Sequence, residues 1–162
     1  MVRILLIALL SLAACDSTDV PVQGLSAEAA ASLEPLLLDE HHAEALYARV
    51  IADFGPVQPF VNIREAEIRH AASLEAVYAR YGLRLPDNPF TPETVDGFLS
   101  VAAACAAAVD AEIANAALYD AALRVDLPAD IRQVVTSNRS ASLDSHLPAF
   151  ERCAASSSRR SH

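Results

Sequence analysis

FVNIREAEIRHAASLEAVYARY, residues 60–81, is the stretch that decides the fold. One set of residues in it is spaced alternately by three and four positions, which is the period of the inner face of a bundle helix. This set consists of Phe60, Ile63, Glu67, His70, Leu74, Val77 and Tyr81. An acid and an imidazole therefore stand in the middle of an otherwise apolar seam. This pattern predicts a bundle helix that carries polar chemistry on its inner face.

Three other segments show a helical period, and each has its own start or stop signals. The predicted helices cover about residues 26–54, 62–81, 91–124 and 129–153. Ser26 and Asn62 can cap helix N-termini. Pro92 stands at the first position of the third helix, and Gly82 stands where a C-terminal cap glycine belongs. The sequence predicts an all-α, up-down-up-down four-helix bundle over residues 26–153, followed by a disordered tail over residues 154–162.

Length, charge and cysteine content limit the classes of function. With 162 residues, the chain is long enough for one domain with one sizeable core. Its formal net charge of −9 argues against nucleic-acid binding, which needs a basic face. Cys105 and Cys153 can form a disulfide if the chain is exported, or they can pack as small core residues. The sequence leaves both possibilities open.

The first fifteen residues resemble the leader of an exported lipoprotein. Arg3 precedes an apolar segment, residues 4–10, that is too short to span a bilayer. The Leu-Ala-Ala-Cys that ends at Cys15 resembles the lipobox of bacterial lipoproteins, whose cysteine becomes the lipidated first residue of the mature chain. We expect a signal peptide over residues 1–14 and a polar tether over residues 15–25. These features predict a lipid-anchored protein on the periplasmic or extracytoplasmic side of the cell envelope; the alternative is an ordinary secretory leader.

Polar residues interrupt all four predicted seams at one level. They are Glu40, Glu67, His70, Glu112 and His146. In an up-down-up-down bundle, two residues on neighbouring antiparallel helices share a level when their midpoint in sequence falls at the connecting turn. The residues above meet this condition for each neighbouring pair of helices, so we expect them to converge in one buried layer. The same topology places Tyr47 and Tyr119, each two turns from the layer, at one end of the bundle.

The composition of this layer predicts a metal site. Three buried carboxylates need a compensating charge, because an unpaired buried charge costs several kcal/mol and like charges repel one another. Glu67 and His70 share one helix face and form the Glu-x-x-His unit of di-metal carboxylate bundles. Carboxylates and imidazoles together favour iron, with manganese and zinc as alternatives. We predict one or two bound ions; the alternative is a hydrogen-bonded layer without metal.

Several motifs in the chain resemble those of one protein family. Residues 39–47, DEHHAEALY, are similar to its pattern Glu-Glu-x-x-Ala-x-x-x-Tyr, and residues 60–70, FVNIREAEIRH, to Phe-x-Asn-Ile-x-x-x-Glu-x-x-His. With Glu112 and the segment around His146, residues 30–152 resemble the uncharacterised ferritin-like family catalogued as domain of unknown function 2202. The resemblance implies a ferritin-like fold and a metal site, with no established activity. The chain departs from a full di-iron pattern, because Leu143 stands where a second Glu-x-x-His would have its acid.

Three hypotheses of function follow from the sequence. The first is an envelope-anchored metal-binding protein with oxidase- or peroxidase-type redox activity at a di-metal site. The second is non-catalytic metal sequestration or sensing. The third is a metal-free bundle that docks a protein partner through an acidic face. The sequence assigns no catalytic residue, and it leaves the enzymatic activity, the protein partner and the oligomeric state open.

Overall fold

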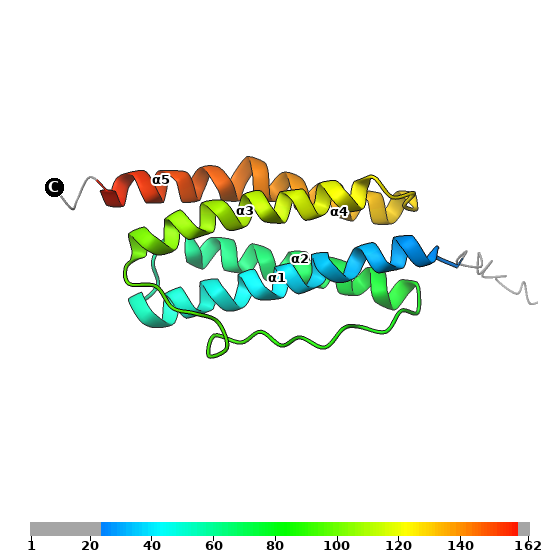
Figure 1. The fold of residues 1–162 in the computed structure, drawn as a ribbon, viewed down its shortest axis with the longest axis horizontal. Coiled ribbons are helices and arrows are strands. Elements are labelled where there is room, and N and C mark those ends of the chain that lie inside the picture. Colours follow the sequence, from blue (N-terminus) through cyan, green and yellow to red (C-terminus); the bar gives the residue numbers. More distant parts are fainter. Residues whose placement is uncertain (1–23, 159–162) are drawn as a thin grey trace, which may run out of the picture.

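A computed structural model describes residues 24–158, and these residues are helical without any strand (Figure 1). The elements are α1 (Ala27–Phe54), α2 (Phe60–Arg80), α3 (Val101–Leu123), α4 (Ala129–Ala141), the π-helical turn η1 (Ser142–His146) and α5 (Leu147–Ser158). Since α4, η1 and α5 follow one another without a break, they form one rod, and the described residues make a bundle of four rods. The predicted all-α bundle is confirmed. The predicted signal peptide, Cys15 and most of the predicted tether lie outside the described residues.

The first two helices begin and end close to the predicted residues. The Ser26 hydroxyl accepts the backbone N–H of Ala29 at 3.1 Å and so caps α1. At the other end of the helical hairpin, α2 is followed by Gly82, whose φ of +64° lies in the left-handed region that a glycine adopts after a helix. Between the two helices, Pro59 already has helical backbone angles, so α2 starts at Phe60, before the predicted cap Asn62.

The third helix starts later than the sequence predicts. Residues 91–100 are irregular, and α3 begins only after Ser100, whose hydroxyl accepts the N–H of Ala103 at 3.1 Å. The Thr94 hydroxyl accepts the N–H of Thr91 at 2.8 Å, which satisfies this backbone group outside a helix. Arg49 of α1 donates to the carbonyl oxygen of Val95 at 3.2 Å and thereby ties the segment to the side of the bundle. The proline at position 92 therefore marks a turn in a connector and no helix start.

The predicted up-down-up-down order is wrong, because α2 and α3 run in the same direction. Figure 1 shows residues 81–100 returning along the outside of the bundle before α3 begins. One apolar cluster accordingly contains Phe60 and Ala104, near the starts of the two helices, and the other contains Val77 and Ala122, near their ends. The connector is long enough for this path: an extended chain covers about 3.3 Å per residue and a helix only about 1.5 Å. The order is up-down-down-up.

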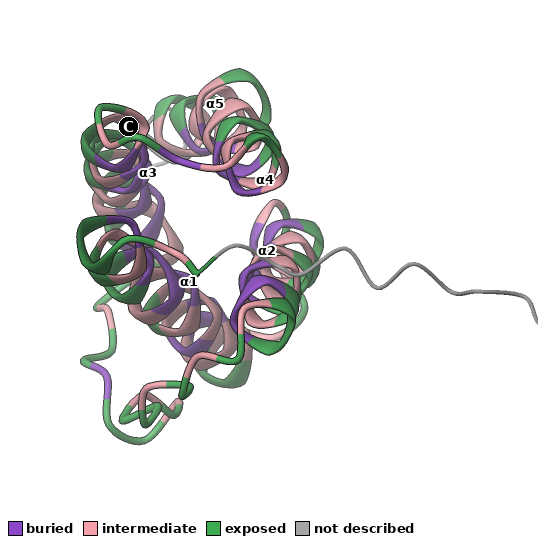
Figure 2. Cartoon of the chain, turned by 90° about the vertical axis from the view of Figure 1, so that its right-hand side faces the viewer, coloured by how far each residue is buried: buried purple, intermediate pink, exposed green. Residues whose placement is uncertain are grey.

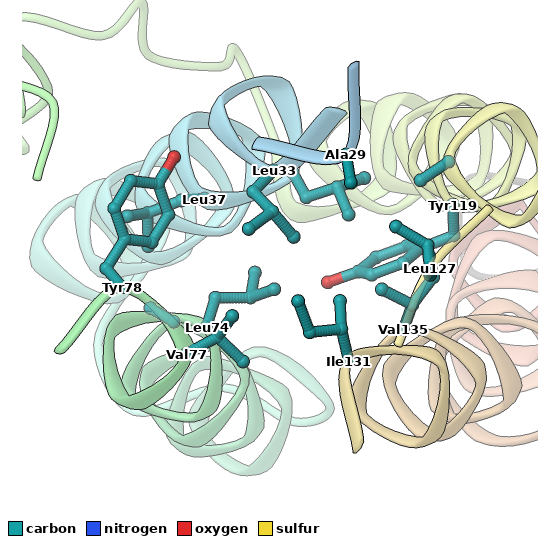
Figure 3. Packing of buried hydrophobic residues seen from close by; sticks show 13 residues of the cluster. Ala29, Leu33, Leu37, Leu74, Val77, Tyr78, Tyr119, Leu127, Ile131 and Val135 are labelled. Atoms are coloured by element: carbon teal, nitrogen blue, oxygen red, sulfur yellow. The ribbon is translucent and has the colours of Figure 1, made fainter. Parts of the chain in front are cut away.

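Two apolar clusters fill the interior on either side of a polar layer. The first lies near the N-terminus of α1, where the side chains of Leu33, Leu74 and Ile131 meet (Figure 3). The second lies near the C-terminus of α1 and contains Phe60 and Phe150. Figure 2 shows that the buried residues lie on the helix faces that are turned toward one another. The apolar clusters hold the four rods together and so fix the positions of the polar side chains between them.

The helix α3 is unusually apolar, with a mean hydropathy of 1.5 over its most apolar 18-residue window. Its length and composition alone would suit a membrane span. In this fold, however, α3 packs against α1, α4 and α5. It also carries Glu112 and Asn115, which are both buried in the interior. Only 33% of this window is buried in the bundle, so the apolar composition also includes exposed alanines such as Ala103, Ala106 and Ala117.

A disulfide joins α3 to α5. The cysteines are Cys105 and Cys153, 48 residues apart in sequence. Ala154 packs beside them against the second apolar cluster. The sequence predicts a disordered tail from residue 154, but α5 continues to Ser158, because the disulfide and this packing hold its last turns on the bundle. Residues 159–162 lie outside the described part of the chain.

Candidate metal centre

Each helical rod contributes at least one polar side chain to the layer between the two apolar clusters. The five side chains are Glu40 from α1, Glu67 and His70 from α2, Glu112 from α3 and His146 from η1. All but His70 are buried, and the His70 side chain is only 12% exposed. The structure thus brings together the five residues that the sequence predicts as ligands. They form two groups of ligand atoms that could hold a metal ion.

The π-helical turn η1 positions His146. The N–H of Leu147 donates to the carbonyl oxygen of Ser142, five residues earlier, instead of to the residue four earlier. Pro148 explains the position of this turn, because a proline has no N–H and its ring clashes with the carbonyl four residues before it. Asn138, Ser142 and His146 are all buried although they are spaced by fours. In a regular helix of about 3.6 residues per turn such a row would rotate off the seam, and the wider turn keeps it facing inward.

The first group of ligand atoms consists of Glu40, Glu67 and His70. The Nδ1 atom of His70 lies 2.9 Å from Oε2 of Glu67 and 3.3 Å from Oε2 of Glu40. One ligand atom from each of the three residues lies within 4.8 Å of the other two. Two carboxylates and one imidazole therefore face a common point between α1 and α2.

The second group consists of Glu67, Glu112 and His146. The Nδ1 atom of His146 lies 3.1 Å from Oε1 of Glu67 and 3.5 Å from Oε2 of Glu112. This nitrogen is buried, and it makes no well-aligned hydrogen bond with either carboxylate. Two carboxylate oxygens and one imidazole nitrogen thus converge on one point without an aligned hydrogen bond between them. A cation could bind to all three atoms there. Because Glu67 belongs to both groups, with one oxygen toward each histidine, the two positions are adjacent.

Two tyrosines hold the outer carboxylates from opposite sides of the layer. The Tyr119 hydroxyl donates to Oε1 of Glu40 at 2.5 Å, and the Tyr47 hydroxyl donates to Oε1 of Glu112 at 2.8 Å. The prediction that the tyrosines share one end of the bundle is wrong: Tyr119 packs in the first apolar cluster and Tyr47 in the second. The cause is the topology, since α1 and α3 run in opposite directions and the prediction had them parallel. Figure 3 shows the Tyr119 hydroxyl pointing into the interior.

A hydrogen-bonded network that the sequence did not reveal supports the side of the layer near Glu40. The Asn115 side-chain amide donates to Oε1 of Glu40 at 3.2 Å and to Oδ2 of Asp39 at 2.8 Å. The Ser142 hydroxyl donates to the Asn115 side-chain oxygen at 2.7 Å, which fixes the orientation of the amide. Asn138 donates to the hydroxyl of Tyr119 at 3.1 Å. The sequence shows that these polar residues stand at inward-facing helix positions. Their hydrogen-bond partners on other helices can be assigned only from the distances in the structure.

The structure also shows which residue of the fourth rod stands where the acid of a second Glu-x-x-His would be. Ser142, and not Leu143, faces the centre of the layer. Two other acids, Asp144 and Glu44, lie near ligand residues in the sequence but do not replace the missing ligand. Asp144 is exposed, and Glu44 pairs with Arg64 at 3.0 Å on the surface. The layer therefore contains three acids and two imidazoles.

The buried charges of the layer shift one another's protonation. Burial raises the pKa of Glu40 to about 7, against the opposing effect of the His70 hydrogen bond. Burial would also raise the pKa of Glu67, but contacts with His146 and His70 outweigh it and hold this pKa below its usual value. Burial tends to lower the histidine pKa values, yet the neighbouring carboxylates raise that of His70 to about 9 and that of His146 to about 10. Without a metal ion, both imidazoles are therefore cations at neutral pH.

No protein-family model matches the chain. No curated protein and no solved structure matches it either. The resemblance to the ferritin-like family of domain 2202 therefore stays a prediction from the motifs. What the geometry establishes is an all-helical bundle with a buried layer of glutamate and histidine side chains that could hold a metal ion.

Proposed function

We propose that this protein binds two adjacent metal ions in the interior of its bundle, with Glu67 shared between them. The observation that carries the proposal is the position of Glu67, whose two carboxylate oxygens face the Nδ1 atoms of His70 and His146 separately. Nδ1 of His146 supports it, because this buried nitrogen lies 3.1 Å from Oε1 of Glu67 and 3.5 Å from Oε2 of Glu112 without an aligned hydrogen bond to either, so a cation could bind between the three atoms. Glu40 and Glu112 complete the two positions as outer ligands.

The donor set favours iron, with manganese and zinc as alternatives, because carboxylate oxygen and imidazole nitrogen suit these ions. When bound, an iron pair would supply redox chemistry of the oxidase or peroxidase type. The protein's own residues would hold and orient the ligands. Tyr119 and Tyr47 donate hydrogen bonds that fix the outer carboxylates, and such outer hydrogen bonds tune both ligand geometry and metal affinity.

We further propose that the protein acts at the cell envelope, anchored by a lipid on Cys15. The leader motif at residues 12–15 supports this location. The disulfide between Cys105 and Cys153 is consistent with it, since disulfides persist in oxidising compartments outside the cytoplasm. Mass spectrometry of the chain purified from a bacterial membrane fraction, beside a Cys15→Ala variant, tests the anchor. An unmodified wild-type cysteine would contradict it.

Metal counting tests the central proposal. The full-length protein is stripped with a chelator, incubated without oxygen with Fe(II), Mn(II) or Zn(II), desalted, and analysed by mass spectrometry. We expect about two ions per chain for the favoured metal and none retained in Glu67→Ala, because both positions need this carboxylate. Glu44→Ala is the matched control, since it makes the same truncation and removes the same charge at a half-buried position outside the layer. A well-folded wild-type protein that retains no metal would contradict the proposal.

A metal-free bundle is the second candidate, and one observation favours it. The raised pKa values of His70, about 9, and His146, about 10, let two imidazolium ions balance the carboxylates without any metal. In that case the layer would be purely structural, and Glu67→Ala would change stability without changing metal content. The metal count in wild-type protein separates the two candidates directly.

A further inference from the structure

A narrow channel between α1 and α3 connects the metal centre to the surface. Its lining includes the buried ligands Glu67 and Glu112 and, on α1, Asp39 and His42. Its volume of about 20 Å³ has room for about one water molecule. His42 is exposed, whereas Glu67 is 2% exposed, so the channel leads from solvent to the buried ligands.

The lining of the channel suits the passage of a cation. It contains three acids, Asp39, Glu67 and Glu112, and the described residues that line it include no arginine. A low-dielectric passage lined by one sign of charge concentrates ions of the opposite sign. The inner end also lies beside the orphaned Nδ1 of His146, which is buried and faces Glu67 and Glu112. Because this nitrogen has no hydrogen-bond partner among the described residues, it is a second sign that a ligand belongs at the inner end.

The outer acid is linked to the inner ligands by one amide. The Asn115 side chain donates to Asp39 at 2.8 Å and to Glu40 at 3.2 Å, so it spans the two carboxylates. On the surface, the His42 ring lies 4.9 Å from the ring of Phe90 in the connector, which positions the imidazole. Asp39 and His42 thus offer an oxygen and a nitrogen donor one helical turn apart on α1.

We infer that Asp39 and His42 form a capture site that takes divalent cations from solvent and passes them through this channel to the buried ligands. The inference rests on the proposed metal binding. A channel with room for about one water cannot admit a hydrated ion, so the ion must exchange its waters for protein ligands at the mouth.

The test is the rate of metal uptake. Metal-free full-length protein is mixed with Co(II) in a stopped-flow instrument, and the absorbance of the bound ion is followed. We expect Asp39→Asn to slow uptake at least about tenfold at low salt while the final stoichiometry equals that of wild type. The difference should shrink at high ionic strength, because salt screens attraction at a distance. Asp110→Asn, the same charge change on the exposed face of α3, should take up metal at the wild-type rate.

A second variant tests the route without changing charge. Ala111 belongs to the α3 wall of the channel and is half-buried, so Ala111→Leu should narrow the bore and also slow uptake. Wild-type uptake rates in Asp39→Asn would overturn the inference, whatever Ala111→Leu does. Equal slowing of metal uptake by Asp110→Asn would also overturn the inference. It would show that the uptake rate depends on the net charge of the protein and not on the position of Asp39. Wild-type protein that binds no metal would instead refute the proposed function itself.

Discussion

The exchange of Glu67 for glutamine in the metal-free protein is the most informative single perturbation of the layer. Glutamine has the shape of glutamate but no charge, so the change leaves the packing intact. In the wild-type protein, the two oxygens of Glu67 lie 2.9 Å from Nδ1 of His70 and 3.1 Å from Nδ1 of His146. A glutamine can offer its one oxygen to only one of these nitrogens. Its NH2 group would then face the N–H of the other imidazole.

The magnitude follows from these contacts. A hydrogen bond to a charged group contributes about 1.5–3 kcal/mol, and removing one partner of a buried charge pair costs about 3–5 kcal/mol. We expect Glu67→Gln to lower the free energy of unfolding by about 3 kcal/mol at neutral pH, since it removes the charge that faces both imidazolium ions while the glutamine oxygen can keep one neutral hydrogen bond, to His70. For a chain of this size the melting temperature should fall by roughly 6–12 °C.

Urea unfolding followed by circular dichroism, with a chelator present, measures this change. Glu44→Gln is the control: the Glu44–Arg64 pair lies at the surface, where an ion pair contributes about 0–1 kcal/mol. The reasoning would be refuted by a Glu67→Gln protein as stable as wild type, or more stable. That result would mean that burying the Glu67 carboxylate costs at least as much free energy as its contacts with the two imidazoles contribute.

Three further changes test separate parts of the structure. Metal-free protein should lose stability as the pH rises through about 9 and 10, the raised pKa values of His70 and His146, because alkaline solution removes protons that only the folded state holds tightly. Urea midpoints that stay level from neutral pH to pH ~10 would contradict this. Tyr119→Phe should weaken metal binding about 10- to 100-fold by freeing Glu40, and an unchanged Kd in a metal titration would show that the hydroxyl only packs. Replacing both cysteines of the disulfide by serine should lower the free energy of unfolding by about 4 kcal/mol, given the 48-residue separation, and an unchanged urea midpoint would count against that contribution.

The sequence was sufficient to predict which residues meet in the interior. The alternating spacings of three and four locate the inward face of each helix, and Glu67 and His70 stand on that face among apolar residues. Burial of both follows once the apolar neighbours form a core. The helical period fixes the face of each side chain, so the membership of the layer was predictable at the level of individual residues. The height of Glu112 agreed although the predicted direction of α3 was wrong, because Glu112 is the middle residue of α3 and keeps its height when the helix is reversed.

The direction of α3 could not be read in the same way. Residues 81–100 contain prolines and turn residues, which show that the segment is no helix but do not show where it leads. The same connector can join two neighbouring antiparallel helices loosely or return along the bundle. In the structure, Arg49 holds the returning connector by donating to the carbonyl oxygen of Val95, 46 residues away in sequence. Such a contact leaves no local pattern in the sequence.

The π-helical turn illustrates a partly readable feature. Pro148 signals that the fourth rod cannot be a regular helix there, and the spacing of Asn138, Ser142 and His146 by fours is consistent with a wider turn. On a regular helix, the acid of a second Glu-x-x-His ending at His146 would stand at position 143, which is Leu143. The wider turn brings Ser142 inward instead, where it bonds to the amide of Asn115.

X-ray diffraction at the iron absorption edge, from crystals of the iron-loaded protein, tests the central claim most directly. We predict two anomalous peaks, one on each side of the Glu67 carboxylate, with His70 beside one and His146 beside the other. Intact helices with no anomalous peak in this layer, or with peaks only at surface acids, would contradict it.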